Sequence, residues 1–529
     1  MNSLVFCLLV SLSASAVSAD GYTCQSDKYQ FSPPDDLSQP LFWPSTWNDS
    51  QPPARFETQQ FCQWEFTVPE GLYATAVFYR DAPSDVRIFA LWPSSQNAQI
   101  ENSDQVPFIF TSPKFNVDMF KSEKQGAFSF KVTWSKYPTM NVSTVKLAKG
   151  DKPAPTVPTA DLKVFTAETN VSLVAFTVKD TSKTAFLRHS AIFDGNSTSG
   201  TFLGTLSTVL SSKKAVVSTG NSLSVYTFGL DKQFDYTLYM AQDHSNDQGV
   251  FTYQGINCPT DAKCSVEVSA VFGPGVFVTV GAHPEFVKGF DRFPENGTLK
   301  VYEGMISDQN LVTTLTKSNY IHRLPMELKN SMRHYVLSNE RFEAQLGLDS
   351  NEAKWNKASD GRKGFVHSMF HGENSSQQDT DETFTTYSNA KLYFNFIVRD
   401  SDFPTEQTAL TVTVSSDGKV VSSTTYNSKN LPPANTVSSQ GDTFNVKYES
   451  HGAITKGFRV DFSVTSAGYA TSPSPSSAPT APSTSQKTST STSSRPTSQT
   501  SGSFETTTRG ASTHFATLAT MSSLLYVLS

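Results

Sequence analysis

Two histidines and a glutamate are the residues whose types and spacing come nearest to a metal-binding or catalytic centre. They are His367, His371 and Glu373, in the segment GFVHSMFHGE. Histidines four residues apart share one face of a helix and could ligate zinc there. The HExxH glutamate is absent, however, and Gly364 and Gly372 flank the segment. Its surroundings are typical of a strand or loop, and in a strand residues four apart lie about 13 Å apart, too far to share a metal ion. We therefore predict a structural role for these side chains.

The rest of the chain offers no pattern typical of catalysis. It contains no G-x-S-x-G elbow and no glycine-rich phosphate loop. A nucleophile, base and acid assembled from distant segments is the alternative that one sequence leaves open, with the segment 250–375 as its place. The sequence therefore predicts a protein that is not an enzyme, with a secreted hydrolase as the alternative.

The cysteines indicate an oxidising compartment. Cys7 lies in the apolar leader, so the mature chain keeps Cys24, Cys62, Cys258 and Cys264. An even number favours two disulfides, and four cysteines allow three pairings. The most local pairing is Cys24–Cys62 with Cys258–Cys264. Their spacing does not form the compact cluster that zinc requires.

Two pairs of loop aspartates could bind calcium if several loops met at one place. They are Asp81 with Asp85, in YRDAPSD, and Asp400 with Asp402, in VRDSDF. Aspartate is also favoured in turns on backbone grounds alone. We predict no cofactor, with calcium as the open alternative.

Three tryptophans in turn-rich segments could stack on sugar rings or anchor a protein partner. They are Trp43, Trp47 and Trp92. The competing interpretation, which we favour for the group, is that they fill a hydrophobic core.

Both ends of the chain indicate export and attachment to a membrane. Residues 1–19 form a short apolar segment closed by small residues, as in a signal peptide. Residues 468–514 are rich in Ser, Thr and Pro and should form a disordered, O-glycosylated stalk. Residues 515–529 form a hydrophobic tail too short to span a bilayer. Small residues before that tail match a glycolipid (GPI) anchor signal, with Ser501 as the attachment candidate and Gly510 as the second.

Sequons and charge agree with this location. The net charge of −6 gives no basic surface for nucleic acid. Acceptor sequons for N-glycosylation begin at Asn48, Asn141, Asn170, Asn196, Asn296 and Asn374.

The elements that position these residues are predicted to be strands. Phe is frequent, with 39 residues, and the apolar runs are short and often alternating. Residues 126–134 and 456–464 alternate strictly, and each follows another alternating run, 115–120 and 444–450. Two such runs joined by a turn that contains glycine predict a β-hairpin that packs on a facing sheet.

Internal repeats predict several similar units. IFDG (192–195) and VYEG (301–304) are each followed, ten residues after the glycine, by Thr-Leu-Ser or Thr-Leu-Thr. GNSLSVYT (220–227) and GDTFNVKY (441–448) share a second frame. We predict an all-β chain of tandem β-sandwiches at 24–137, 160–244, 247–377 and 378–467, with 138–159 as a proline-rich linker.

At this point the chain resembles a known family. IFDG with STGNSLSVYTF (218–228), and SSQGDTFNVKYESHGAITKGFRVDF (438–462), look like parts of a CUB domain. Residues 24–135, with CQWEFTVPEGLYATAVFY (62–79), resemble the nematode-type CUB-like domain. The resemblance implies antiparallel sandwiches of jelly-roll type used in extracellular recognition. The chain departs from the family in its disulfides. A typical CUB domain has two, whereas the local pairing gives residues 24–137 only one. The Glu and two Asp of calcium-binding members have no counterpart that we can align.

These observations favour a glycosylated protein at the cell surface, built of CUB-like modules, that binds an extracellular protein or glycan. The family resemblance implies a setting in innate immune or epithelial defence. A passive glycosylated coat protein is a further alternative.

Overall fold

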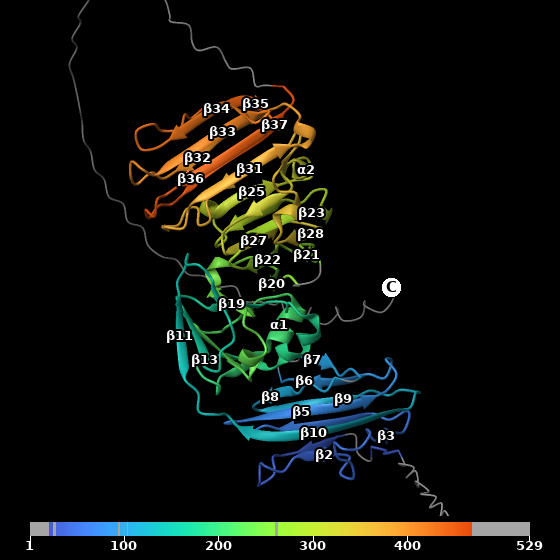
Figure 1. Ribbon diagram of the computed structural model, residues 1–529. Helices are drawn as coiled ribbons and strands as arrows, with labels where there is room; N and C mark the ends of the chain where they lie inside the picture. The colour runs from blue at the N-terminus through green and yellow to red at the C-terminus, as the bar shows by residue number, and fades with distance from the viewer. Residues whose placement is uncertain (1–20, 25–27, 94–95, 103, 260–262, 468–529) are drawn as a thin grey trace, which may run out of the picture. The chain divides into compact units, whose positions relative to one another are not determined.

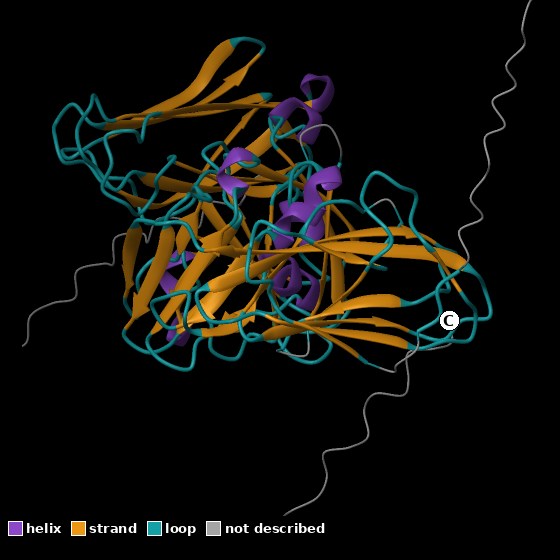
Figure 2. Ribbon diagram, turned by 90° about the horizontal axis from the view of Figure 1, so that it is seen from below, coloured by secondary structure: helices purple, strands orange, loops and turns teal. Residues whose placement is uncertain are grey.

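The computed structural model describes residues 21–24, 28–93, 96–102, 104–259 and 263–467. The predicted signal peptide, stalk and hydrophobic tail, with the anchor candidates Ser501 and Gly510, lie outside these residues. Strands dominate the described chain, and its helices are short (Figure 2). None of these helices has both the length and the apolar character needed to cross a membrane.

The first sandwich packs a five-stranded sheet, in the order β1-β4-β9-β6-β7, against the sheet β2-β10-β5-β8, with β3 paired to β10. Its strands are β1 (Tyr29–Phe31), β2 (Leu41–Trp43), β3 (Arg55–Phe56), β4 (Cys62–Thr67), β5 (Leu72–Asp81), β6 (Ile88–Leu91), β7 (Asn97–Gln99), β8 (Phe108–Thr111), β9 (Lys114–Met119) and β10 (Gly126–Lys136).

The second sandwich has the sheets β11-β13-β18-β15-β16 and β12-β19-β14-β17. Its strands are β11 (Val142–Leu147), β12 (Ala154–Thr156), β13 (Leu162–Ala167), β14 (Val171–Ala175), β15 (Ser190–Asp194), β16 (Thr201–Gly204), β17 (Val216–Val217), β18 (Ser222–Thr227) and β19 (Tyr239–Asp243). Helix α1 (Leu206–Ser212) follows β16, and its N-terminus carries a capping box at Thr205.

The third sandwich has the sheets β20-β22-β27-β24-β25 and β21-β28-β23-β26. Its elements are β20 (Thr252–Ile256), β21 (Cys264–Ser269), β22 (Gly275–Val280), β23 (Glu285–Arg292), β24 (Leu299–Glu303), β25 (Leu311–Leu315), α2 (Tyr320–Arg323), β26 (Met326–Leu328), β27 (Met332–Leu337) and β28 (Arg341–Gly347).

The fourth sandwich has the sheets β29-β31-β36-β33-β34 and β30-β37-β32-β35. Its elements are α3 (Ser350–Ala353), β29 (Lys357–Ala358), β30 (Lys363–His367), β31 (Thr380–Thr386), β32 (Leu392–Ser401), β33 (Ala409–Ser416), β34 (Lys419–Tyr426), β35 (Val437–Gly441), β36 (Thr443–Glu449) and β37 (Phe458–Thr465).

The four sandwiches repeat one strand order. Their succession along the chain can be followed by colour in Figure 1. We number the strands of each sandwich from one to nine in chain order and leave β3 out of the count. The first sheet of every sandwich then has the order one, three, eight, five, six, and the second sheet has the order two, nine, four, seven. The first strand pairs in parallel with the third in every sandwich, and all other pairings are antiparallel. The prediction of a tandem all-β fold is therefore confirmed, with one parallel pair in each sandwich.

The sequence repeats occupy equivalent places. GNSLSVYT and GDTFNVKY form the eighth strands β18 and β36. IFDG and VYEG end the fifth strands β15 and β24, and each glycine has a positive φ. In the pairing of the fifth strand with the sixth, Ile192 lies opposite Gly204 and Val301 lies opposite Thr313. Leu206 and Leu315, the leucines of the downstream echo, are both fully buried.

The two predicted hairpins are wrong. β9 pairs with β4 and β6, whereas β10 pairs with β2, β3 and β5 in the other sheet. β36 and β37 are separated in the same way. Alternation shows which side of a strand is buried, but not which strand lies next to it. The apolar faces of each predicted pair instead meet across the core.

The expected unit boundaries also shift. Residues 138–159, predicted as a linker, supply β11, which pairs along its whole length with β13, and β12, which pairs with β19. In the predicted third unit, 247–377, the last segment supplies α3, β29 and β30 of the fourth sandwich. Strands β12 and β29 are short, with three and two residues, and β12 contains a proline, so the sequence there is typical of a loop.

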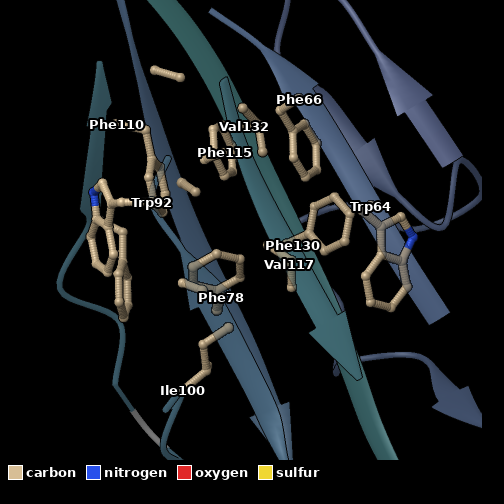
Figure 3. Packing of buried hydrophobic residues seen from close by; sticks show 14 of the residues in the cluster. Trp64, Phe66, Phe78, Trp92, Ile100, Phe110, Phe115, Val117, Phe130 and Val132 are labelled. Carbon is tan, nitrogen blue, oxygen red and sulfur yellow. The ribbon is translucent and has the colours of Figure 1, made fainter. Parts of the chain in front are cut away.

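Aromatic rings fill the core of the first sandwich (Figure 3). Trp64 lies on β4 and Phe130 on β10, so rings from the two sheets meet with centroids 5.5 Å apart. Phe66 stacks on Phe115, with centroids 4.4 Å apart. Edge-to-face and offset contacts of this kind add to the free energy of burial.

Candidate functional site

The histidine segment lies where the third and fourth sandwiches meet. His367 is the last residue of β30, and the chain then turns, so the rings of His367 and His371 have centroids only 5.8 Å apart. The separation of about 13 Å expected for a strand is therefore wrong, because the strand ends at the first histidine.

His367 is buried between charged groups, with 3% of its surface exposed. Its Nδ1 lies 2.8 Å from the carbonyl oxygen of Ser368. Its Nε2 lies 3.3 Å from a carboxylate oxygen of Glu303 but makes no hydrogen bond. Burial lowers the pKa of His367 to about 4, and the positive charge of Lys329 acts in the same direction.

Glu303 holds the loop before β27. Its Oε1 accepts the backbone N–H groups of Lys329, at 2.6 Å, and Asn330, at 3.0 Å. The equivalent residue of the second sandwich, Asp194, accepts the backbone N–H of Thr219 at 3.1 Å. The acid of the IFDG and VYEG repeats therefore caps the loop before the eighth strand. In the third sandwich, its second oxygen also faces His367.

A buried lysine joins the same two sandwiches. Nζ of Lys329 lies 3.5 Å from Glu327 in the third sandwich and 3.0 Å from Glu382 in the fourth. Burial, together with the nearby charge of Glu382, raises the pKa of Glu327 to about 7, against the opposing effect of Lys329. Protons and charges at this junction are therefore coupled.

A cavity of about 240 Å³ opens beside this network. The Glu373 carboxylate there accepts hydrogen bonds from Lys152 of the second sandwich and from Asn330 of the third. Nε2 of His371 lies 2.6 Å from Asp400. The cavity is lined by Lys152, Glu303, Gly304, Gln309, Asn310, Leu311, Val312, Asn330, His371, Gly372, Glu373 and Arg459.

This arrangement favours positioning of the sandwiches over turnover of a substrate. His371 and Glu373 point to different partners, so the three predicted residues do not meet at one atom. Across the described ranges, no three His, Cys, Asp or Glu side chains are placed to hold a metal ion.

The other three loop aspartates serve local structure. Asp85 pairs with Lys124 at 3.0 Å. Asp402 accepts the backbone N–H of Lys456 at 2.8 Å. Asp81 is exposed at the end of β5.

The cysteines form the predicted local pairs. Cys24 is bonded to Cys62 and Cys258 to Cys264. The first bond fastens the N-terminal segment to β4, and the second joins the start of β21 to the loop before it.

The sequon asparagines differ in accessibility. Asn170 is half-buried, and its Nδ2 donates to the carbonyl oxygens of Ser218, Thr219 and Gly220. A glycan on that nitrogen would compete with these bonds. The exposed sequon asparagines are Asn48, Asn141, Asn196, Asn296 and Asn374.

The three tryptophans considered for sugar stacking belong to the interior. Trp47 and Trp92 are buried, and the indole N–H of each donates to backbone carbonyls. Trp43 is half-buried and contacts Trp64 and Phe130. The core interpretation is therefore confirmed.

A different aromatic cluster lies on the surface of the first sandwich. Phe120 is 44% exposed, and its ring centroid lies 5.8 Å from that of Phe61 and 5.8 Å from that of Phe89. We call Phe61, Phe89 and Phe120 the phenylalanine surface. The signal for it is the pair Met119-Phe120, since consecutive strand residues point to opposite faces and Met119 is buried.

Comparisons with solved structures gave matches of low similarity. One is the CUB1-EGF-CUB2 domains of rat MASP-1, at 9% identity, which covers 40% of this chain and 99% of that chain with a TM-score of 0.14. Another is the corresponding region of human MASP-1/3, at 10% identity, covering 39% and 95% with a TM-score of 0.16. The extracellular region of zebrafish Gpr126/Adgrg6 matches at 9% identity, covering 68% and 62% with a TM-score of 0.18.

Family models match three successive segments, and no curated protein matches the chain. Two models describe domains of unknown function, DUF7592 at residues 149–228 and DUF7591 at residues 245–351. These segments fall within the second and third sandwiches. The model of the CUB-like domain matches residues 19–138, which hold β1 to β10 and the phenylalanine surface. Residues 19–138 are therefore a CUB-like domain.

Proposed function

We propose that this chain is an extracellular recognition protein that binds a protein partner through the phenylalanine surface and catalyses no reaction. The CUB-like domain supports a role in extracellular protein interaction. The other sandwiches, joined to it by buried contacts, would then hold that domain in place.

The phenylalanine surface is the observation that carries the proposal. An exposed phenylalanine loses no hydrogen bonds when a partner covers it and gains about 1.5–3 kcal/mol on full burial. Aromatic side chains are also enriched among the residues that dominate binding energy. An exposed ion pair, Asp85 with Lys124, lies in the adjoining loops and supplies a polar rim.

The titratable groups of the candidate site support binding over catalysis. His371, Glu373 and Glu303 are each engaged with groups of the protein itself. A general base has to keep a lone pair free for a substrate proton. We assign these residues to holding the third and fourth sandwiches together.

The proposed setting is the outer surface of a cell. Two disulfides and five exposed sequons support a secreted protein, and the composition of residues 468–529 supports a GPI anchor. Phosphatidylinositol-specific phospholipase C should release the chain from membranes. Retention after treatment, with an active control enzyme, would contradict the anchor and leave recognition intact.

The resemblance to nematode-type CUB-like proteins supports epithelial defence as the biological role. Deletion of the chain should then lower survival when an epithelium is infected. In the same epithelium without infection, deletion should leave survival unchanged. Equal survival with and without the chain would contradict this role.

Substitution of Phe120 tests recognition directly. The full-length chain, displayed on cells, should capture partners from extracellular fluid, and Phe120→Ser should weaken capture at least 10-fold. The matched control is Val421→Ser, an exposed apolar residue on β34 of the fourth sandwich. Equal capture by both variants would contradict the proposal. If the displayed chain captured only glycans, its partner would be a glycan and not a protein. If it captured nothing, the result would favour a passive coat protein.

A further inference from the structure

A buried arginine inside the third sandwich has more donors than partners. Arg333 lies on β27, opposite Thr279 of β22 and Glu303 of β24. Its neighbours two and four residues on, Tyr335 and Leu337, belong to the core of that sandwich. Arg333 is therefore on the core side of the sheet, at one end of the sandwich, and only 1% of its surface is exposed.

Most of its hydrogen-bonding capacity is unused. A guanidinium carries five N–H donors. Nη2 of Arg333 donates to the carbonyl oxygen of His283. Nε is buried and has no partner, and within the described part of the chain Nη1 makes no hydrogen bond. A buried charge is costly unless it is paired.

The other buried arginines have partners that Arg333 lacks, although Nε of Arg80 and both Nε and Nη2 of Arg362 are also buried without a hydrogen bond. Arg188 makes a bidentate pair with Asp104, at 2.7 and 2.6 Å. Arg80 donates to three backbone carbonyls. Arg362 lies over three aromatic rings. Arg333 has neither a bidentate partner nor a ring against it among the described residues, so its environment calls for an added group.

Arg333 borders a cavity of about 160 Å³. Ala282 and His283, in the loop between β22 and β23, are exposed and form its mouth. A Cβ on Gly281 would lie 3.7 Å from Nη1 of Arg333. The cavity is lined by Lys179, Ile256, Asn257, Cys258, Thr279, Val280, Gly281, Ala282, His283, Glu285, Arg333 and Leu348.

Two residues with acceptor atoms, Glu285 and Asn257, also line this cavity. Glu285 is buried, and its Oε1 accepts from Thr279 at 3.0 Å and from the Tyr335 hydroxyl at 2.5 Å, while its Oε2 has no such partner among the described residues. The side-chain nitrogen of Asn257 donates to two carbonyls, so its oxygen is the atom left for a donor. The lining of the cavity therefore combines a cation with acceptor atoms.

We propose that this cavity binds a small α-hydroxy or α-amino acid, whose carboxylate pairs with Arg333 and whose hydroxyl or ammonium group donates to Glu285. A planar guanidinium matches a carboxylate in bidentate geometry. The carboxylate at Glu285 favours a ligand that also carries a donor, and it disfavours a simple anion such as acetate. The same chemistry can come from a free acid or from the free end of a peptide.

Titration calorimetry on the full-length chain tests the site, with lactate, glycine, acetate and glycylglycine as probes. Lactate or glycine should bind at least 10-fold more tightly than acetate. Comparable binding of glycylglycine would identify a peptide terminus as the source, and its failure would identify a free acid. No heat from any probe, or equal affinity for acetate, would overturn the proposal.

Two variants separate binding from folding. Arg333→Met should abolish binding of lactate and glycine, and Gly281→Leu should do the same with the arginine retained, because the new side chain fills the mouth. Arg341→Met, an exposed arginine on β28 of the same sandwich, is the control and should bind as the parent does. If Arg333→Met is unfolded by circular dichroism, Gly281→Leu decides. Unchanged binding in a folded Gly281→Leu chain would contradict the assignment.

Discussion

The junction between the second and third sandwiches is apolar, whereas the junction between the third and fourth is built around charges. The apolar junction buries residues of both partners and contains Val174, Phe176, Met240, Tyr253, Val276, Val278 and Met332. In the charged junction, Lys329, Glu327, Glu382, Glu303 and His367 face one another. Apolar burial is indifferent to protons, but a buried charge network is not. One chain therefore holds its modules together in two ways that respond differently to pH.

Two buried histidines show the contrast at the level of atoms. In the apolar junction, Nδ1 of His334 lies 2.6 Å from the carbonyl oxygen of Gly304, and Nε2 lies 2.7 Å from the Tyr253 hydroxyl. A neutral ring satisfies both contacts, because Nδ1–H donates and Nε2 accepts. Burial lowers the pKa of His334 to about 4, in agreement with that neutral form.

His367 is in a different position. With Nδ1–H donating to Ser368, the Nε2 lone pair of the neutral ring faces an oxygen of Glu303. Two acceptors then oppose each other, and the contact improves only when a proton is added. The same residue type is therefore matched to its surroundings in one junction and mismatched in the other.

The largest effect should come from the apolar junction. Phe176 is fully buried and packs against Gly255, where a Cβ would lie 2.2 Å from the ring. Phe176→Ala should lower the free energy of unfolding by about 3–5 kcal/mol in urea denaturation, equally at pH 5.5 and pH 8. Phe272→Ala is the control, since Phe272 is 80% exposed. A loss that changed with pH would break the contrast between the junctions.

Removal of the buried lysine should destabilise the charged junction in a pH-dependent way. Lys329→Met leaves Glu327 and Glu382 without their cation, at a loss of about 3 kcal/mol at pH 8. The loss should be smaller at pH 5.5, because Glu327 then carries a proton. Lys447→Met, which removes an exposed pair with Glu449, is the control and should leave the free energy of unfolding unchanged within the error of the measurement. Equal losses at both pH values would show that Glu327 does not titrate in this range.

The two histidines should respond unequally to the same substitution. His334→Phe leaves the Gly304 carbonyl and the Tyr253 hydroxyl unpaired, at a loss of about 2 kcal/mol. His367→Phe leaves only the Ser368 carbonyl unpaired and removes the acceptor opposite Glu303, so its loss should be about 1 kcal/mol or less. Thermal unfolding at pH 7 provides the measurement. The reverse order would mean that His367 is the better matched ring.

The smallest effect is a change in slope with pH. The pKa of Glu327 rises from 4.5 to about 7 on folding, so the folded chain binds this proton more tightly than the unfolded chain. That stabilisation is fully present below pH 4.5 and is lost as the pH rises through 7. Between pH 6 and pH 8 the parent should lose about 1 kcal/mol more than Glu327→Gln. If the stability of the parent and that of Glu327→Gln changed equally with pH, the titrating group would be a residue other than Glu327. The buried histidines, with pKa values near 4, act in the opposite direction below pH 6.5.

The sequence predicts the class of the fold because alternation and repeats are local signals. Phe458, Val460, Phe462 and Val464 are all buried, as their spacing requires. Strand partners depend on distant contacts, which is why β36 and β37 were paired wrongly. The segment 142–147 lies in the predicted linker, yet it forms an edge strand.

The candidate site was only partly predictable for the same reason. His367 and His371 were identified by their spacing, but Glu303 and Lys329, which set their environment, lie about 40–60 residues away in the sequence. The cavity at Arg333 likewise joins β22, β23 and β27, and no short motif marks it. The pair Met119-Phe120 is the local signal for the exposed position of Phe120, because Met119 is buried.

The shared strand order also determines how the chain can fold. In each sandwich, only the fifth and sixth strands are both consecutive and hydrogen-bonded, as β6–β7, β15–β16, β24–β25 and β33–β34. Every other pairing joins strands that are not consecutive in the sequence. The contact order is therefore high, and we expect folding to be slow. During that interval the edges of the early hairpins are open to pairing with another chain. Four modules in one polypeptide multiply this exposure, so we expect chaperones to raise the yield of the folded chain.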